Sequence, residues 1–439
     1  MVIASIDLKD GKVVQLKNGK EKVLERDDPE ELIAEFDRYG EVAVIDLDAA
    51  LGNTIKPGVT VNSGIVKKLL RSGNVRVGGG IRDVKRAKEL VSLGAEKVIV
   101  GSAAFLRSAE GAGSVNTAAV NTAAVNTAFL SELCEAIGRD RVIVSVDAIH
   151  GKIAVKGWTE SSGIDLIEGA RAVEQYASEL LFTCVEREGC MTGADMELVR
   201  SLRSAVSCRL VAAGGVSSVE EITELEKMGC DVQLGMALYT RAVSLKDAFI
   251  GCLNWEKAEL IPVIAQSVAG EVLMMGYANR DAFEKTFDSG KLTFWSRTRN
   301  VLWTKGEHSG NHLSVVRLRA DCDRDTVLAT VIPAGPVCHT GSWTCFQGSG
   351  QPPYTLEYLS GIIAERFSNP RPGSYTATLD DERVREKIME EAEELTEAGN
   401  RDEVIWEFAD LLYFMNVLMY RERVSWKDIL DELDRRHKK

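Results

Sequence analysis

The sequence predicts three consecutive domains: an N-terminal (β/α)₈ TIM barrel, a middle α+β domain built mostly on an antiparallel sheet, and a C-terminal all-α domain. A length of 439 residues exceeds one ordinary domain. Hydrophobic periodicity changes twice along the chain, from alternating strand and helix patterns to strands and then to helices. The first part also repeats itself. We place the domains at residues 1–250, 253–347 and 355–439.

The composition is that of a globular chain, with 45% hydrophobic and 27% charged residues. No apolar run is long enough to span a membrane, and residues 1–7 resemble a strand more than a signal peptide, so we expect a cytoplasmic protein without a membrane partner. Nine scattered cysteines favour reduced thiols over disulfides. A net charge of −13 argues against nucleic acid as a partner, but phosphorylated small molecules remain compatible.

Short β-branched runs alternate with amphipathic stretches up to about residue 247, which is typical of parallel strands joined by helices. The runs lie at residues 42–47, 75–77, 97–100, 142–146, 210–213 and 232–234. An internal repeat makes this a barrel of two similar (β/α)₄ halves. Ser5-Ile6-Asp7 recurs as Ser145-Val146-Asp147, Gly79-Gly80-Ile81 as Gly214-Gly215-Val216, and Gly101-Ser102 as Gly235-Met236.

The repeated glycine turns are expected at the ends of strands three, four, seven and eight, where backbone N–H groups can hold phosphate in such barrels. The residues of the two phosphate sites are Gly79, Gly80, Gly101, Ser102, Gly214, Gly215 and Gly235. Two sites related by a pseudo-two-fold axis imply a substrate with a phosphate at each end. Asp7 and Asp147 end strands one and five at the mouth of the barrel, which suits general acid–base catalysis. A strand-end Asp can also be only a helix cap, and the matched pair favours catalysis.

The barrel motifs resemble those of the phosphoribosylformimino-AICAR-phosphate isomerase family. They are Ile6-Asp7-Leu8, Val44-Ile45-Asp46-Leu47-Asp48, Val77-Gly78-Gly79-Gly80-Ile81-Arg82, Asp147, Val155-Lys156-Gly157-Trp158 and Thr183. The resemblance implies the Amadori rearrangement of an aminoaldose bisphosphate to an aminoketose. It assigns Asp7 as general base and Asp147 as general acid, with Thr183 assisting, Trp158 stacking on the substrate base and Arg82 binding substrate.

Four residues depart from the isomerase pattern. Gln15 stands where Arg is usual, Cys184 and Glu188 each stand where Asp is usual, and Arg241 stands where a small residue is common. Glu188 therefore takes the place of a catalytic carboxylate, displaced by one methylene, and a misplacement of about 1 Å can cost roughly a hundredfold in rate. Three interpretations stay open: a slow isomerase, an isomerase with an altered substrate, and a degenerate barrel that no longer catalyses.

The segment from Asp321 to Cys345 contains two kinds of metal ligand. If residues 321–325 are extended, Asp321, Asp323 and Asp325 share one face and suit Mg²⁺, while Cys322 lies on the other. Cys322, Cys338 and Cys345 supply three thiolates for Zn²⁺, and three protein ligands leave a fourth position for water, as in catalytic zinc sites. The alternatives are a solvated acidic turn with buried cysteines, and a structural zinc site in an interaction protein.

Residues 253–347 resemble phosphoribosyl-AMP cyclohydrolase. The motifs are Phe294-Trp295-Ser296-Arg297-Thr298-Arg299, Leu302-Trp303-Thr304-Lys305-Gly306-Glu307, Ser309-Gly310-Asn311, the acidic cysteine run and Cys338-His339. The resemblance implies hydrolytic opening of an adenine ring at a zinc site, with His339 as a proton shuttle. It also implies substrate binding by Ser296, Arg297, Trp303, Lys305 and Glu307, and a homodimer formed through the middle and C-terminal domains.

In the C-terminal domain, Glu391 and Glu394 lie three residues apart on one predicted helix, and Glu407 and Asp410 on the next, so each pair shares a face. Four carboxylates facing one groove indicate Mg²⁺. A solvated acidic face is the alternative. With Ser374-Tyr375-Thr376 before it, the pattern resembles phosphoribosyl-ATP pyrophosphohydrolase over residues 355–438, which implies hydrolysis of phosphoribosyl-ATP to phosphoribosyl-AMP and pyrophosphate.

The three resemblances point to consecutive reactions of histidine biosynthesis. They imply a trifunctional enzyme or, if the barrel is degenerate, a bifunctional one. Two segments lie outside these motifs: a Gly/Ser/Pro linker at residues 347–353, and an Ala-Val-Asn-Thr-Ala repeat at residues 114–128. The repeat is either a neutral loop expansion or a perturbation of the phosphate site at Gly101-Ser102.

Overall fold

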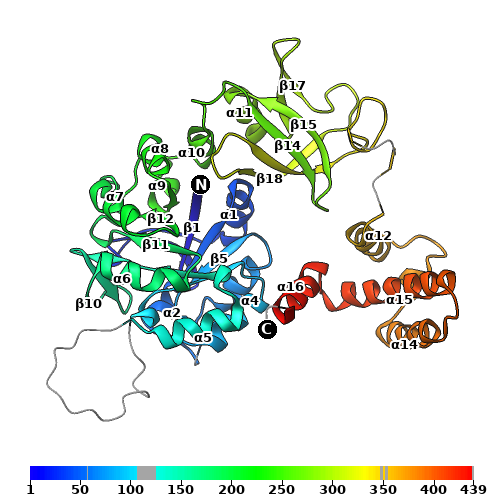
Figure 1. Ribbon diagram of the computed structural model, residues 1–439, viewed down its shortest axis with the longest axis horizontal. Coiled ribbons are helices and arrows are strands. Elements are labelled where there is room, and N and C mark those ends of the chain that lie inside the picture. Colours follow the sequence, from blue (N-terminus) through cyan, green and yellow to red (C-terminus); the bar gives the residue numbers. More distant parts are fainter. Residues whose placement is uncertain (57, 106–124, 347–349, 352–353, 438–439) are drawn as a thin grey trace. The chain divides into compact units, whose positions relative to one another are not determined.

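The computed structural model describes residues 1–56, 58–105, 125–346, 350–351 and 354–437 (Figure 1). Most of the five-residue repeat and most of the linker therefore lie outside the described residues. The chain divides into two compact units, one of residues 1–265 with 275–335 and the other of residues 266–274 with 336–439. Among the described helices, none combines the length and apolar character needed to cross a membrane.

Eight parallel strands close into a barrel in the first unit, which confirms the predicted fold, because β13 pairs with both β12 and β1. The barrel strands are β1 (Val2–Lys9), β4 (Val42–Asp46), β5 (Val75–Gly78), β6 (Lys97–Val100), β7 (Val142–Ser145), β11 (Glu179–Thr183), β12 (Arg209–Ala213) and β13 (Cys230–Leu234). The same sheet continues from β1 into β2 (Lys12–Lys17) and β3 (Glu21–Arg26). A separate small sheet has the order β10-β9-β8, from β8 (Ala148–Ile149), β9 (Lys152–Val155) and β10 (Glu160–Asp165).

Helices connect the barrel strands. They are α1 (Pro29–Phe36), α2 (Leu47–Leu51), α3 (Ser63–Leu69), α4 (Val84–Ser92), α5 (Thr127–Ile137), α6 (Leu166–Val173), α7 (Met196–Ala205), α8 (Val219–Lys227), α9 (Met236–Tyr239) and α10 (Leu245–Cys252). Short 3₁₀ turns are η1 (Asp37–Tyr39), η2 (Ser102–Ala104), η4 (Arg139–Arg141), η5 (Glu174–Tyr176) and η6 (Val185–Arg187).

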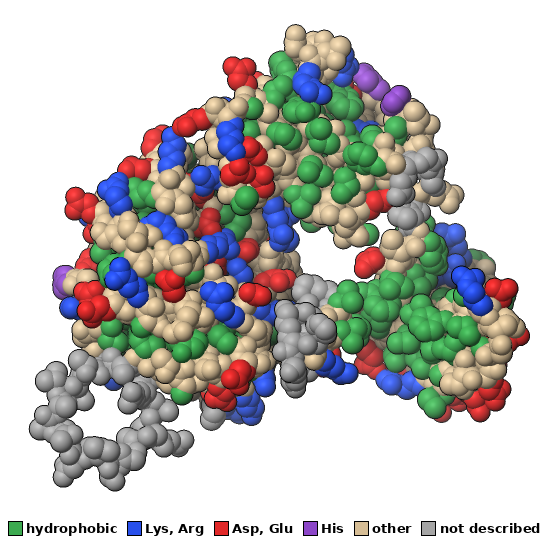
Figure 2. All heavy atoms as spheres, in the orientation of Figure 1, with side chains coloured by type: hydrophobic (Ala, Val, Ile, Leu, Met, Phe, Trp, Pro, Cys, Tyr) green, Lys and Arg blue, Asp and Glu red, His purple; other side chains and the backbone are tan. Residues whose placement is uncertain are grey.

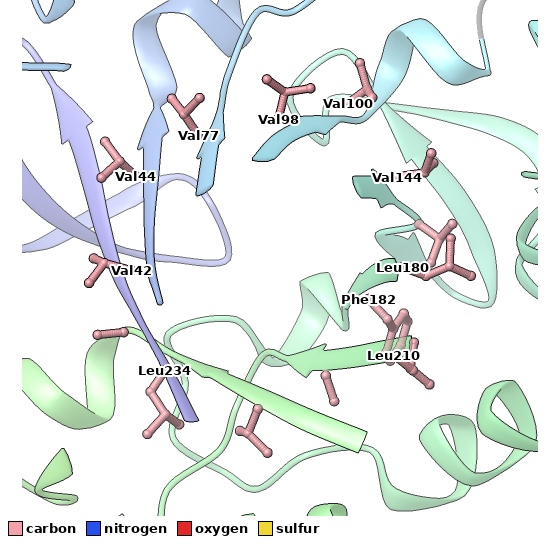
Figure 3. Packing of buried hydrophobic residues seen from close by; sticks show 14 of the residues in the cluster. Val42, Val44, Val77, Val98, Val100, Val144, Leu180, Phe182, Leu210 and Leu234 are labelled. Atoms are coloured by element: carbon pink, nitrogen blue, oxygen red, sulfur yellow. The ribbon is translucent and has the colours of Figure 1, made fainter. Parts of the chain in front are cut away.

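Side chains of most barrel strands alternate between two hydrophobic clusters, as strand geometry requires. Val42 and Val44 belong to a large cluster that also contains helix residues such as Leu90, whereas Ala43 belongs to a small cluster made by the strands. Figure 3 shows members of the large cluster from successive strands, among them Val44. The large cluster thus fills the layer between strands and helices, and the small cluster fills the barrel interior.

The predicted internal repeat is visible in the backbone. Helices α4 and α8 follow the two glycine turns, and each begins at a capping side chain: Asp83 accepts the N–H of Arg86, and Ser218 accepts the N–H of Glu221. Such a cap contributes about 1 kcal/mol to helix stability. The two capping residues have nearly identical dihedral angles, with φ −145° and ψ 162° at Asp83, and φ −144° and ψ 162° at Ser218.

Residues 261–333 form a four-stranded sheet of order β15-β14-β19-β18, with a separate two-stranded hairpin. The elements are β14 (Ile261–Ser267), β15 (Val272–Ala278), α11 (Arg280–Ser289), β16 (Thr293–Ser296), β17 (Val301–Thr304), β18 (Leu313–Ala320) and β19 (Val327–Pro333). β18 and β19 pair antiparallel, as do β16 and β17, in agreement with the predicted antiparallel character. Buried and partly exposed residues alternate strictly along β14, so one face of this strand is covered.

Within the first unit, the barrel packs against α11 through aromatic rings. Tyr39 stacks on Phe287 with ring centroids 4.6 Å apart, and Phe249 of α10 meets Phe287 edge to face at 5.5 Å. Arg317 of β18 donates from Nε to the carbonyl oxygen of Asp37 at 3.0 Å. These contacts join the barrel and the sheet in one compact unit.

The C-terminal part is helical, as predicted. Its helices are α12 (Leu356–Ser368), α13 (Tyr375–Thr378), α14 (Asp381–Glu397), α15 (Arg401–Glu422) and α16 (Trp426–His437). A small core joins α12, α14 and α15 through Leu359, Ile363, Val384, Phe414 and Val417. The acidic motifs lie on α14 and α15, so these two helices carry the candidate metal site of this domain.

Candidate active sites

A cavity of about 430 Å³ opens at the carboxyl ends of the barrel strands, where barrel enzymes carry their active sites. Every barrel residue that the sequence predicted as catalytic or substrate-binding lines this cavity. These residues are Asp7, Gly79, Gly80, Arg82, Gly101, Ser102, Asp147, Trp158, Thr183, Glu188, Gly214, Gly215 and Gly235. Residues from both halves of the repeat therefore meet around one space.

The glycine turns bring the backbone close to neighbouring strand ends. At Gly79, with φ +106°, a Cβ atom would lie 2.1 Å from the carbonyl oxygen of Asp46. At Gly214, with φ +95°, a Cβ atom would lie 2.7 Å from the carbonyl oxygen of Cys184. Only glycine fits such a position, because both the dihedral angle and the space exclude a side chain. The backbone is therefore exposed to the cavity at matching points of the two halves.

Hydrogen bonds from nearby side chains fix the carboxyl groups of the two predicted catalytic aspartates. Trp158 donates from its indole Nε1 to Asp147 at 2.8 Å, and Thr183 also hydrogen-bonds the Asp147 carboxyl. Ser5 donates from Oγ to Asp7 at 2.8 Å. Ser145 stands two residues before Asp147, as Ser5 stands before Asp7, and it interacts with the Asp147 carboxyl. Asp147 Oδ1 is buried and has no hydrogen-bond partner within the described part of the chain. This oxygen therefore has unused capacity to accept a hydrogen bond at the cavity.

Three carboxyl groups of the cavity have altered proton affinity. Burial raises the pKa of Asp7 to about 6, although the bond from Ser5 opposes the shift. Burial also raises the pKa of Asp147. Burial, with added repulsion from Asp7 and Asp147, raises the pKa of Glu188 to about 8. An ionised Asp7 and a protonated Glu188 can thus coexist near neutral pH, and such a difference between neighbouring carboxyl groups suits paired base and acid catalysis.

Of the four departures from the isomerase pattern, only Glu188 lines the cavity. Gln15 is buried and packs against the turn at Gly235, since a Cβ on Gly235 would lie 2.7 Å from Gln15 Oε1. The Cys184 thiol is directed to Glu186, at 3.7 Å, and burial raises its pKa to about 11. Arg241 is exposed. Cys184 and Arg241 therefore change the surroundings of the cavity more than its lining.

The acidic run at residues 321–325 is a turn between β18 and β19, so the prediction of an extended segment is wrong. Asp321 Oδ1 accepts the backbone N–H groups of Asp325 and Thr326 at 3.1 and 3.2 Å, and these bonds fold the chain back. The turn still gathers the carboxylates: ligand atoms of Asp321, Asp323 and Asp325 lie within 4.8 Å of one another. Three converging carboxylate oxygens fit a hard divalent cation.

The predicted zinc ligands divide between the two compact units. Cys322 is exposed on the acidic turn of the first unit, and Cys338 and Cys345 belong to the second. The thiols of Cys338 and Cys345 interact by a hydrogen bond. Hydrogen bonding, chiefly from Thr340, lowers the pKa of Cys338. His339 Nδ1 lies 3.8 Å from Cys338 Sγ. A paired, easily ionised thiol suits Zn²⁺, which binds thiolates.

The predicted nucleotide-binding residues lie on the β16–β17 hairpin and the loop after it. Phe294 and Trp303 are cross-strand partners, with ring centroids 5.8 Å apart. The Arg297 guanidinium lies over the Tyr277 ring at 3.9 Å. The remaining predicted residues are partly or fully built into the hairpin: Ser296 accepts from Arg299, Lys305 is buried, and Glu307 accepts the Thr304 N–H at 3.2 Å.

On the helical segment, ligand atoms of Glu391, Glu394 and Glu407 lie within 4.8 Å of one another, so α14 and α15 bring both acidic motifs together. The fourth predicted residue, Asp410, is close enough to repel Glu407. Desolvation first, and then repulsion from Glu394, Glu391 and Asp410, raises the pKa of Glu407. A divalent cation would relieve this repulsion, so the cluster fits Mg²⁺.

Sequence reasoning gave no role to two serines that interact with the predicted catalytic aspartates. Ser5 and Ser145 each precede an aspartate by two residues, which places them on the same side of a strand as Asp7 and Asp147. The Ser-x-Asp element of the internal repeat was the available signal. Lys257 was also missed, although it contacts Asp325 at 2.8 Å.

Comparison with known proteins matches all three regions in order. The histidine biosynthesis protein family matches residues 1–244, phosphoribosyl-AMP cyclohydrolase matches residues 274–347, and phosphoribosyl-ATP pyrophosphohydrolase matches residues 356–437. Fold and sites together define a multidomain biosynthetic enzyme. The chain belongs to the histidine biosynthesis protein family and carries an isomerase-family barrel, a cyclohydrolase domain and a pyrophosphohydrolase domain.

Similar curated proteins bear the name histidine biosynthesis bifunctional protein HisIE. The protein from Vibrio parahaemolyticus is 43% identical over 197 residues, which is 42% of this chain and 93% of that protein. The protein from Pasteurella multocida is 44% identical over 199 residues, 43% of this chain and 99% of its own length. The protein from Bacteroides thetaiotaomicron is 44% identical over 194 residues, 42% of this chain and 96% of its own length.

Proposed function

We propose that the chain is a trifunctional enzyme that catalyses consecutive steps. The C-terminal domain hydrolyses phosphoribosyl-ATP to phosphoribosyl-AMP and pyrophosphate. The middle domain opens the adenine ring of phosphoribosyl-AMP, and the barrel isomerises the later aminoaldose to an aminoketose. The observation that carries the isomerase assignment is that one cavity is lined by every barrel residue that was predicted to be catalytic or substrate-binding. Each assignment rests on the matching family and on the residues present.

In the barrel, Asp147 donates a proton to the ribose ring oxygen and Asp7 removes the carbon-bound proton that the rearrangement releases. The proton affinities support this division, because the pKa of Asp7 is about 6, so this carboxyl is largely ionised at neutral pH. Asp147 has its pKa raised by burial and is held by Trp158. General acid–base catalysis of this kind contributes roughly 10²–10⁴-fold to a rate.

In the middle domain, Cys322, Cys338 and Cys345 would hold Zn²⁺, and Asp321, Asp323 and Asp325 would hold Mg²⁺. Zinc supplies activation of water, since it lowers the pKa of a bound water molecule to about 7. His339 would move a proton in this reaction, and its Nδ1, 3.8 Å from Cys338 Sγ, supports this role. The residues of the β16–β17 hairpin orient the nucleotide, and the indole ring of Trp303 stacks on the base.

In the C-terminal domain, Glu391, Glu394, Glu407 and Asp410 would hold Mg²⁺, which brings a triphosphate into line for hydrolysis. Lys387 contacts Glu391 at 3.0 Å and limits the negative charge of the cluster. The helices also present apolar side chains to solvent: Trp406 is 70% exposed on α15 and Met389 is 71% exposed on α14. Hydrophobic side chains gather over this region in Figure 2.

We further propose a cytoplasmic homodimer in which these apolar side chains are covered by a second copy. A helix that is apolar on several faces is normally buried on several faces. Trp406→Glu should therefore shift the molar mass measured by light scattering from dimer to monomer. A wild-type chain that is monomeric at micromolar concentration contradicts the dimer.

The test of the trifunctional assignment is to incubate the chain with phosphoribosyl-ATP, Mg²⁺ and Zn²⁺ and to identify the products by chromatography. Appearance of the aminoketose supports three activities. Accumulation of the aminoaldose supports the second candidate, a bifunctional hydrolase with a non-catalytic barrel, which the longer Glu188 side chain favours. In that case Glu188→Asp together with Cys184→Asp should restore isomerisation, and failure to do so counts against the second candidate as well.

A further inference from the structure

The acidic turn of the middle domain is tied to the barrel by the arginine at its centre. Arg324 has φ +62°, in the left-handed region that non-glycine residues seldom occupy. Its Nη1 donates to the backbone oxygen of Glu226 at 3.1 Å and contacts the Glu226 carboxylate more closely. Glu226 lies on α8 of the barrel. A strained turn residue is thus held by a charged contact to another domain.

The barrel partner of this contact is rigidly placed. Glu226 is only 2% exposed, and it sits one residue before the end of α8. A buried carboxylate strongly favours a cationic partner, and removal of such a partner is costly. Glu226 has two cationic partners: the N-terminal ammonium of Met1 contacts one carboxylate oxygen, and Arg324 contacts the other. Arg324 is the partner that comes from the acidic turn, so this ion pair links the position of the turn to the position of α8.

Residues that connect the two domains hold the same turn from a second side. Asn254 donates from its backbone N–H to the oxygen of Arg324 at 2.7 Å, and from Nδ2 to the oxygen of Asp323 at 3.3 Å. Lys257 contacts the carboxylates of Asp323 and Asp325. The backbone and the carboxylates of the turn are therefore both fixed by residues outside it.

We propose that Arg324 and Glu226 are positioning residues through which the barrel sets the geometry of the Asp321–Asp325 turn and hence its affinity for a divalent cation. The inference rests on the proposed metal-binding function of the turn. Residues that orient metal ligands from outside the coordination shell typically change metal affinity by roughly 10–100-fold. The barrel thus contributes to the hydrolytic half of the enzyme whether or not it isomerises its own substrate.

The test compares Arg324→Met with Arg317→Met in the full-length chain. Both variants remove an arginine that bonds to the barrel, but Arg317 lies in β18 and binds Asp37, whereas Arg324 lies in the turn. Both are made in a Glu394→Gln, Glu407→Gln background, which removes the helical metal cluster. Binding of Mn²⁺ is followed by electron paramagnetic resonance without substrate, and thermal melting confirms that each variant is folded.

We expect Arg324→Met to weaken Mn²⁺ binding about tenfold or more, Arg324→Lys to recover part of the loss, and Arg317→Met to change it less than about twofold. Cyclohydrolase assays should show a higher Mg²⁺ requirement with kcat restored at saturating Mg²⁺. Unchanged Mn²⁺ binding in Arg324→Met, or an equal loss in Arg317→Met, overturns the proposal. If Asp323→Asn leaves Mn²⁺ binding unchanged, the turn is not the metal site. That result would overturn the proposed metal-binding function, as distinct from the positioning role of Arg324.

Discussion

Three groups of carboxylates in this chain differ in their surroundings and therefore in their chemistry. In the barrel, Asp7, Asp147 and Glu188 line a cavity, and desolvation is the main cause of their raised pKa values. In the acidic turn, Asp321 and Asp323 are exposed, and their ligand atoms converge within 4.8 Å. Carboxyl groups spread around a desolvated cavity can exchange protons, whereas convergent carboxylates near solvent bind cations.

The helical cluster belongs with the acidic turn in this comparison. Glu391, Glu394 and Glu407 converge as the turn aspartates do, and repulsion among them contributes to the raised pKa of Glu407. Both clusters have a lysine at their edge, Lys257 at the turn and Lys387 at the helices. The spacing of carboxylates along the chain is therefore not enough to tell a proton-transfer site from a metal-binding site. The burial of the carboxylates must also be known.

The largest effect is expected from removal of a proton-transfer group. Asp147→Asn should lower isomerase kcat/KM by about 10²–10⁴-fold, because the amide cannot donate the required proton. The rates of pyrophosphate release and of ring opening should stay within about twofold, since the two clusters of candidate metal ligands lie outside the barrel cavity. Stopped assays with each purified intermediate measure the three steps separately. A parallel loss of all three activities would mean that the substitution acts on folding.

A comparable loss in a different step is expected from the helical cluster. Glu407→Gln should reduce pyrophosphate release on the order of 100-fold, because a divalent cation supplies several kcal/mol of charge stabilisation. Isomerisation should not change. Glu393→Gln is the matched control, because it also removes one carboxylate, here from the neighbouring helix α14, at a residue outside the cluster. Equal effects of the two variants would indicate a general electrostatic effect instead of a metal site.

Much of this arrangement could be predicted from the sequence. The internal repeat placed Asp7 and Asp147 on matching strands, and barrel closure then brought them to one cavity. The fold of residues 321–325 was predicted wrongly, because a period-two pattern of aspartates fits a strand as well as a turn stabilised by side-chain bonds to the backbone. The contact of Arg324 with Glu226 joins residues 98 positions apart, and no local pattern indicates it.

The pH dependence of isomerisation sharpens the comparison further. With Asp7 as base, only its ionised form is active. Below its pKa of about 6, kcat/KM should therefore increase about tenfold for each unit by which the pH is raised. At high pH the rate should fall as Glu188 loses its proton near pH 8, because this adds a negative charge beside Asp7 and Asp147. The profile should therefore be bell-shaped. A flat profile between pH 5 and 9 would contradict acid–base catalysis by these carboxyl groups.

The smallest effect concerns stability. The pKa of Glu188 is raised in the folded state from 4.5 to about 8, so the folded chain binds more protons than the unfolded chain between these values. Its contribution to stability is thus complete below pH 4.5 and falls as pH rises toward 8, on the order of 1 kcal/mol per pH unit. Glu188→Gln removes this titration. Urea unfolding at pH 5 and pH 8 should show a smaller difference for the variant than for wild type, because the amide stays neutral throughout. Identical differences in the two proteins would mean that Glu188 is solvated and ionised in the fold, and that its carboxyl belongs with the exposed clusters.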